Sequence, residues 1–187
     1  MATIRNEVPA DIDPREALLE RVWGPARLQK TAERLREGRR PAAGLSFVAA
    51  HHGDVMGTVR LWDVSAGPGR PALLLGPLAV DEAARCRGIG GALIRRAITA
   101  ARRRKHRAVL LVGDAAYYKR FGFSAERTDA LWLPGPYERH RLLGCELVPG
   151  ALEGARGLVS ATGHAAPAPS LDALIAHLAR HQDRHAA

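Results

Sequence analysis

The sequence predicts an α/β (α+β) domain in which helices flank a mixed central sheet. The first observation is a pair of strongly apolar runs, residues 71–80 and 108–112, on either side of an amphipathic helical pattern over residues 90–102. A strand, a helix and a second strand in this order predict a parallel crossover. The second observation is a pair of strand patterns joined by a short turn over residues 44–64, which predicts antiparallel neighbours. One chain with both kinds of pairing predicts a mixed sheet.

The N-terminal part is expected to supply a short strand at residues 2–6 and then two helices. Asp13-Pro14 is typical of a helix start, and Gly24-Pro25 ends that helix. A second helix is expected over residues 26–37. The hairpin then follows, with strands at residues 44–50 and 55–64 around a turn at His51-His52-Gly53-Asp54.

The middle of the chain continues with the two buried strands and the helix between them. Gly76-Pro77 interrupts the first strand, and a bulge is expected there because proline has no N–H to donate to the ladder. After the second strand, Asp114 is expected to cap a short helix that runs through Lys119 and ends at Gly122. Two further strands are expected at residues 130–133 and 140–148.

The chain is expected to divide into a domain at residues 1–152, a linker at 153–169 and a final helix at 170–187. The linker prediction rests on a composition rich in Gly, Ala and Pro. The helix has an apolar face that must be buried, either on the domain or on a second copy of the chain in a homodimer. This face consists of Leu171, Leu174, Ile175 and Leu178.

The composition of the chain limits the classes of protein to which it can belong. The chain has 187 residues, 47% apolar and 25% charged, which suits one globular domain. No apolar run reaches membrane-spanning length, and the polar start is not typical of a signal peptide, so a cytoplasmic protein without membrane contact is expected. Cys86 and Cys145 are too far apart in the sequence for a metal-ligand pair or a disulfide framework. No metal is expected.

The net charge of +9 favours an anionic partner. Basic residues cluster at Arg95, Arg96 and residues 102–107, where they suit the negative end of a helix dipole or reach toward a cofactor phosphate. Aromatic residues make up only 5% of the chain and do not alternate with these cations, which disfavours a nucleic-acid surface.

The most informative motif is a glycine turn between strand and helix, Arg85-Cys86-Arg87-Gly88-Ile89-Gly90-Gly91. Glycines let the backbone approach a ligand closely, and the first turn of a helix offers unpaired N–H groups to an anion. The turn therefore predicts a site for a phosphate-bearing cofactor. Cys86 within it is either an activated thiol or a small residue in a tight turn.

The order of elements, this turn and the later segment Tyr117-Tyr118-Lys119-Arg120-Phe121-Gly122-Phe123 together resemble the GNAT superfamily of acetyl-CoA-dependent N-acetyltransferases. Within it, Val112-Gly113-Asp114 followed by the Tyr-Tyr and Phe-Gly-Phe pairs is similar to the small bacterial predicted-acetyltransferase branch. The close likeness spans residues 73–123. It implies a GNAT fold whose sheet splays between the fourth and fifth strands, and a GNAT domain over residues 1–152.

The resemblance implies roles for the cofactor side. Backbone groups of Leu78, Ala79 and Val80 are expected to pair with the pantetheine arm of acetyl-CoA. The N–H groups of Cys86, Gly88, Ile89, Gly90 and Gly91 are expected to hold its pyrophosphate, with Arg85 or Arg87 adding charge. A backbone N–H near Leu78 would stabilise the oxyanion that forms during acyl transfer.

The resemblance also implies a catalytic tyrosine. The expected general acid is Tyr118, which would protonate the leaving thiolate, with Tyr117 as the alternative. Many relatives have a base glutamate on the cofactor strand, and residues 71–80 contain none. The possible substitutes are Asp63, His51, His52 and Glu126, whereas Asp114 is expected to be a helix cap.

The expected function is acetyl transfer from acetyl-CoA to an amine-bearing acceptor by direct attack in a ternary complex. A second interpretation is a sensor of the same fold that binds acetyl-CoA without chemistry, favoured by the missing strand glutamate. A third, a basic nucleic-acid-binding domain, has no recognised motif in the chain. The acceptor is expected to be selected by residues 14–37 and 134–139.

Overall fold

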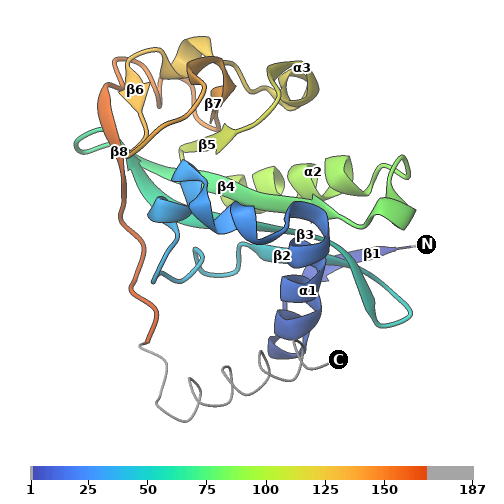
Figure 1. Cartoon of the computed structure of the whole chain (residues 1–187). Helices are drawn as coiled ribbons and strands as arrows, with labels where there is room; N and C mark the ends of the chain where they lie inside the picture. The colour runs from blue at the N-terminus through green and yellow to red at the C-terminus, as the bar shows by residue number, and fades with distance from the viewer. Residues whose placement is uncertain (1, 168–187) are drawn as a thin grey trace.

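A computed structural model describes residues 2–167 and is built around a mixed sheet (Figure 1). The strands follow the order β1-β2-β3-β4-β5-β7, and along this path β4 and β5 are parallel while the other neighbours are antiparallel. Their bounds are β1 Thr3–Asn6, β2 Ser46–His51, β3 Asp54–Ala66, β4 Pro71–Val80, β5 Ala108–Val112 and β7 Leu142–Glu146. Two short strands, β6 Leu131–Trp132 and β8 Gly157–Ala161, extend it at one end. The predicted mixed sheet is confirmed.

The sheet splays between β4 and β5. The two strands pair only at Leu73 with Val109 and at Leu74 with Leu110, so β4 runs on to Val80 with no strand beside it on that edge. Figure 1 shows β5 turning away from β4 beyond this point. On its other edge β4 pairs with β3 with a register shift between Val59 and Leu61. This irregularity lies opposite the Gly76-Pro77 step, where a bulge was expected.

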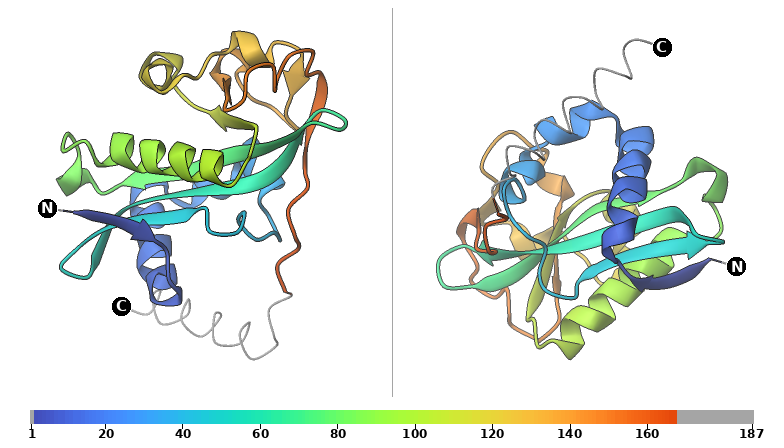
Figure 2. Two further views of the ribbon diagram at one scale, coloured as in Figure 1. Left: turned by 180° about the vertical axis from the view of Figure 1, so that it is seen from behind. Right: turned by 90° about the horizontal axis from the view of Figure 1, so that it is seen from below.

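Helices cover both faces of the sheet (Figures 1 and 2). Helix α2 (Ile89–Arg103) packs on one face, where Leu93 and Ile94 are fully buried in the main core. Helix α1 (Ile12–Trp23) packs on the opposite face through Leu18 and Leu19. The apolar stripe predicted for residues 90–102 is the face that α2 buries.

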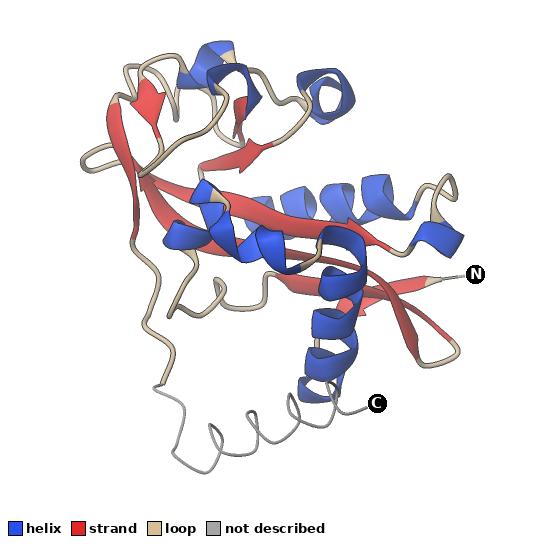
Figure 3. Ribbon diagram, viewed as in Figure 1, coloured by secondary structure: helices blue, strands red, loops and turns tan. Residues whose placement is uncertain are grey.

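The prediction of a second N-terminal helix over residues 26–37 is wrong, because no α-helix forms there. The segment forms two 3-10 helices, η2 (Pro25–Gln29) and η3 (Thr31–Leu35), shown in Figure 3 beside α1. Lys30 between them is extended, with φ −66° and ψ 138°, so no i to i−4 ladder crosses it. The hydroxyl of Thr31 donates to the carbonyl oxygen of Pro136, a long-range contact that the local sequence pattern does not contain.

The linker expected over residues 153–169 is corrected at residues 157–161, which form β8. This strand pairs with the end of β3 at Val64–Ala66 and in parallel with β6. Strand β3 has 13 residues and continues past its pairing with β2, which leaves an edge for β8 to fill. The fully buried side chain of Val159 anchors it. The final helix expected at 170–187 lies outside the described residues.

The predicted short helix after β5 is confirmed. Helix α3 (Ala115–Tyr118) begins where Asp114 Oδ1 accepts the backbone N–H of Ala116 at 3.0 Å, and η5 (Lys119–Phe121) ends at Gly122 with φ +88°. The remaining helical turns are η1 Pro9–Asp11, η4 Glu82–Ala84, η6 Glu126–Thr128 and η7 Arg139–Arg141. None of the helices in residues 2–167 is both long and apolar enough to cross a membrane.

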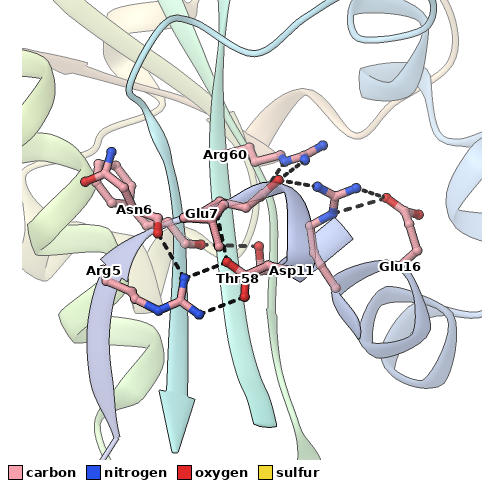
Figure 4. Close-up of polar contacts among 10 residues, drawn as sticks. Arg5, Asn6, Glu7, Asp11, Glu16, Thr58 and Arg60 are labelled. Atoms are coloured by element: carbon pink, nitrogen blue, oxygen red, sulfur yellow. Dashed lines mark hydrogen bonds and ion pairs between the residues drawn. The ribbon is translucent and has the colours of Figure 1, made fainter. Parts of the chain in front are cut away.

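A partly buried chain of ion pairs joins the start of the chain to η2; we call it the ion network. Glu7 accepts from Arg60 and, at 2.6 Å, from Arg15. Arg15 also pairs with Glu16 at 2.6 Å, and Glu16 pairs with Arg27 of η2 at 2.7 Å. Figure 4 shows Glu7, Glu16 and Arg60 of this network. Burial raises the pKa of Glu7, and Arg15 opposes that shift. The network fixes η2 against α1 and the sheet.

Candidate functional site

Two cavities lie along β4 beyond the point where it leaves β5. The splay cavity, about 480 Å³, is lined by residues 74–78 of β4, residues 112–114, Tyr118, η2 and η3, and the segment 133–141. The turn cavity, about 510 Å³, is lined by Val80, most of residues 84–91, Arg95, Tyr117 and residues 120–121. The two cavities share no lining residue, but they border successive parts of β4, residues 74–78 and Val80, and adjacent tyrosines, Tyr118 and Tyr117.

The turn cavity has the features of an anion site. Strand β4 ends at Val80, η4 follows, and the turn enters α2 at Gly88, whose φ of +75° is left-handed and favours glycine. Gly88 supplies no side-chain cap, so the N–H groups of the first turn of α2 remain available. These groups and the positive end of the helix dipole suit a phosphate.

Most of the predicted cofactor residues line this cavity: Val80, Arg85, Cys86, Gly88, Ile89, Gly90 and Gly91. Arg87 instead lines a third cavity of about 310 Å³, together with His51 and Met56. Ala79 is buried among side chains of α1 and β2. Leu78 lines the splay cavity.

The turn cavity contains two further cations: Arg95, which belongs to the basic cluster noted in the sequence, and Arg120, which was not predicted as a cofactor residue. The guanidinium carbon of Arg120 lies 4.1 Å from the ring centroid of Tyr117, and that of Arg95 lies 5.9 Å from the ring centroid of Phe121. Helical spacing was the available signal, since Arg95 comes four residues after Gly91. The part of that cluster at 102–107 is at the other end of α2, roughly 20 Å along the axis from the turn.

Tyr118, the predicted general acid, lies on the splay-cavity side. Burial, with a smaller contribution from Tyr117, raises the pKa of Tyr118 to about 12, so its phenol is protonated at neutral pH. Its ring packs edge-on against Tyr117 and Phe123 at centroid distances of 5.0 and 5.8 Å. Tyr117, the alternative acid, faces the turn cavity instead, with its hydroxyl 3.2 Å from where a Cβ of Gly90 would be.

Gly113 makes room for the ring of Tyr118. A Cβ at Gly113 would clash with Cε2 of that ring and would lie 2.9 Å from Cδ2. Real Cβ atoms do not approach side-chain carbons this closely, so any larger residue would move the ring. Gly113, which directly follows β5, therefore positions Tyr118.

The carbonyl oxygen of Leu78 already has a partner. The indole N–H of Trp23, at the end of α1, donates to it at 3.2 Å. Trp23 is 44% exposed and also lines the splay cavity. The expectation that a pantetheine arm pairs with backbone groups near Leu78 therefore requires this indole to share or release that carbonyl.

The four possible bases expected from the sequence, His51, His52, Asp63 and Glu126, do not line the splay cavity. Its carboxylates are instead Glu33, Asp114 and Glu138. Asp114 caps α3, as expected. Glu33 was missed because it belongs to η3, a segment whose conformation was predicted incorrectly. In residues 2–167 no three histidine, cysteine, aspartate or glutamate side chains are grouped as metal ligands.

Comparison with known proteins agrees with this geometry. Residues 13–123 match the model of the acetyltransferase (GNAT) family. The uncharacterized N-acetyltransferase YhbS of Escherichia coli K12 is 31% identical over 162 residues, which are 86% of this chain and 96% of YhbS.

Two solved structures resemble the whole domain. The crystal structure of E. coli YhbS in complex with CoA has a TM-score of 0.73 and 31% identity, covering 86% of this chain and 89% of that one. A GNAT family acetyltransferase from Brucella melitensis in complex with acetyl-CoA has a TM-score of 0.62 and 27% identity, covering 87% and 96%. The match across residues 13–123 and the likeness to nearly all of YhbS show that the chain belongs to the GNAT family of acetyltransferases.

Proposed function

We propose that this protein transfers the acetyl group of acetyl-CoA to a primary amine while both substrates are bound. The observation that supports this most strongly is the position of two cavities on successive parts of β4 and on the adjacent tyrosines Tyr117 and Tyr118. One cavity has the properties of an anion site, and the other has room for an acceptor. Complexes of related proteins with CoA and acetyl-CoA support the choice of cosubstrate.

The turn cavity fits coenzyme A. The N–H groups from Cys86 to Gly91 would hold the pyrophosphate, and Arg95 and Arg120 would add positive charge from α2 and η5. The unpaired edge of β4 up to Val80 would face the pantetheine arm. When bound, acetyl-CoA supplies an activated acetyl thioester at the splay.

The chemistry assigned to this chain's own residues is proton transfer and positioning. Tyr118 is protonated at neutral pH and would donate its proton to the departing sulfur. Gly113 keeps the ring of Tyr118 in place. The carboxylates Glu33, Asp114 and Glu138 are the groups on the acceptor side that would take a proton from the incoming ammonium, directly or through water.

The test is the release of free thiol from acetyl-CoA over a panel of primary amines, with the acetylated product identified by mass spectrometry. The proposal expects thiol release that depends on one class of amine and a matching acetylated amine. Tight CoA binding with no acetylated product over a broad panel would contradict it.

That last outcome would favour a sensor that binds acetyl-CoA without chemistry. One observation supports this second function: β4, residues 71–80, contains no carboxylate that could serve as the base.

A further inference from the structure

The splay cavity is lined by four cations: Arg27, Lys30, Arg36 and Arg141. They come from η2, the residue between the two 3-10 helices, the residue after η3, and η7. Arg27, Lys30 and Arg36 lie close together in the sequence, and the fold brings the distant Arg141 to the same cavity. What each cation already binds decides which of them can bind a ligand.

Three of the four, Arg27, Arg36 and Arg141, are already paired with carboxylates. Arg27 belongs to the ion network, where its Nη2 lies 2.7 Å from Glu16, and its Nε lies 3.8 Å from Glu20. Arg141 pairs with Glu138 at 3.4 Å on the exposed rim. The charges of Arg27 and Arg141 are offset without a ligand, although the Nε of Arg27 is buried and has no hydrogen-bond partner within residues 2–167.

Arg36 is only partly satisfied. Its side chain is 8% exposed, and its Nη2 pairs with Glu33 at 2.9 Å. Its Nε is buried and has no hydrogen-bond partner within the described part of the chain. Its Nη1 lies 3.4 Å from where a Cβ of Gly76 would be, so the guanidinium reaches β4 at the splay. A buried donor without a partner is costly unless a ligand binds it.

Lys30 differs from the other three cations because no carboxylate in the described part of the chain is paired with it. Within residues 2–167 it forms no ion pair, and its ammonium lies over the ring of Trp23, 4.0 Å from the centroid. Partial burial lowers the pKa of Lys30, and the nearby charges of Arg141 and Arg36 lower it further. Positive charge is thus concentrated at this wall of the cavity, and an anion placed there would be stabilised.

We infer that the acceptor is a small amine that also carries an anionic group, a carboxylate or a phosphate, bound by Lys30 and Arg36. This rests on the proposed function and adds to it the class of acceptor. A cavity of about 480 Å³ suits a small molecule. The amine faces Tyr118 and Leu78, which line the same cavity. A guanidinium and an ammonium together match a carboxylate or a phosphate.

The experiment compares pairs of amines that differ in the anion. Each standard L-amino acid is paired with its amide, and 2-aminoethyl phosphate is paired with ethanolamine. Acetyl transfer is followed by thiol release, and binding is measured by calorimetry on protein saturated with CoA. The amino-acid pairs test a carboxylate, and the phosphate pair tests a phosphate.

The variants are Lys30→Met and Arg36→Gln, with Lys105→Met as the matched control. Lys105 is an exposed lysine beyond the far end of α2 and lines neither the splay cavity nor the turn cavity. For at least one pair, the anionic member should be preferred by about tenfold or more in kcat/KM, the usual effect of a charge-assisted contact. Lys30→Met should remove that preference, and Lys105→Met should keep it. If the Arg36→Gln variant folds, its preference for the anionic amine gives a second test of the same contact.

The outcomes separate this inference from the proposed function. Transfer to neutral amines as fast as to anionic ones confirms the function and overturns the inference, and so does an anion preference that Lys30→Met leaves intact. Weaker CoA binding in Lys30→Met would also overturn it, since the cations would then serve the coenzyme. If no amine is acetylated, calorimetry decides: anion binding that Lys30→Met abolishes supports the inference, and its absence from every pair overturns it.

Discussion

At the scale of single residues, the proposed acid catalysis depends on Tyr118 and on Gly113, which makes room for its ring. Burial raises the pKa of Tyr118 to about 12, so the residue is held in its proton-donating form. Gly113 lies against its ring, and Tyr117 and Phe123 pack on it from other sides. The chemistry of the proposed acid thus follows from packing and desolvation rather than from a charged neighbour.

Tyr118→Phe removes the proton donor and keeps the ring. Packing should survive because the ring provides most of the buried area. Turnover should fall by roughly a hundredfold or more, while the affinity for CoA stays the same. Because burial raises the pKa of Tyr118 to about 12, any loss of kcat/KM through its ionisation should begin only above about pH 10 and should vanish in the variant. Steady-state kinetics across pH checks this, and full turnover in the variant would refute the assignment.

Gly113→Ala should displace the ring of Tyr118, because the added Cβ would lie 2.9 Å from Cδ2. We expect kcat to fall by roughly tenfold or more, as for a misplaced catalytic group, with little change in the KM for acetyl-CoA. Gly163→Ala is the matched control, since its Cβ would meet its neighbours at ordinary contact distances of 3.4 Å or more. In the Tyr118→Phe background, Gly113→Ala should cost no further turnover; equal losses in both backgrounds would show a purely structural effect.

Sequence patterns predicted residues that line the turn cavity, and they assigned the acceptor side to residues 14–37 and 134–139 without naming its individual cations, for a physical reason. Gly88, Gly90 and Tyr118 belong to local motifs whose spacing is visible in one stretch of chain. Lys30 and Arg36 acquire their place from the 3-10 conformation of residues 25–35 and from contacts with residues 76 and 136. No local pattern contains such contacts.

At the scale of elements, the junction of β4 and α2 does most of the functional positioning. Strand β4 ends beside an open edge, and α2 begins with uncapped N–H groups at Gly88. Apolar runs predicted both strands of the splay and the helix between them, because each buries a continuous hydrophobic surface. Strand β8 was not predicted because the small residues around it are typical of a linker. In addition, its pairing partner, the far end of β3, lies about a hundred residues away in the sequence.

Gly90→Val tests the junction without straining the backbone. Gly90 is helical, whereas Gly88 has a φ of +75°, at which a side chain would itself be strained. A side chain at position 90 would point at the hydroxyl of Tyr117 and at Val80, both on the wall of the turn cavity. We expect at least a tenfold loss of CoA affinity by calorimetry in a protein that remains folded.

Thr99→Val is the control for this change. Thr99 is an exposed residue on the same helix, and the substitution keeps a β-branched side chain of similar size away from both cavities. CoA affinity should be unaffected. Unchanged affinity in a folded Gly90→Val protein would mean that the coenzyme does not bind at this turn.

At the scale of the whole molecule, the two proposed binding regions, the turn cavity and the splay cavity, lie beside successive parts of one strand, β4. The turn cavity is formed by α2 and η5, and the splay cavity by the N-terminal 3-10 helices and the segment 133–141. The ion network from Arg60 through Glu7, Arg15 and Glu16 to Arg27 connects the sheet to the acceptor-side wall. The arrangement favours direct transfer between two bound substrates, with no need for an acetylated enzyme.

Direct transfer is tested most directly by the initial rate of thiol release when the concentrations of acetyl-CoA and of a free amine that the protein acetylates are both varied. Direct transfer predicts intersecting reciprocal plots and no burst of thiol when the amine is left out. Parallel plots, with a thiol burst and acetylated Cys86 in the absence of amine, would contradict direct transfer and would indicate an acetylated enzyme.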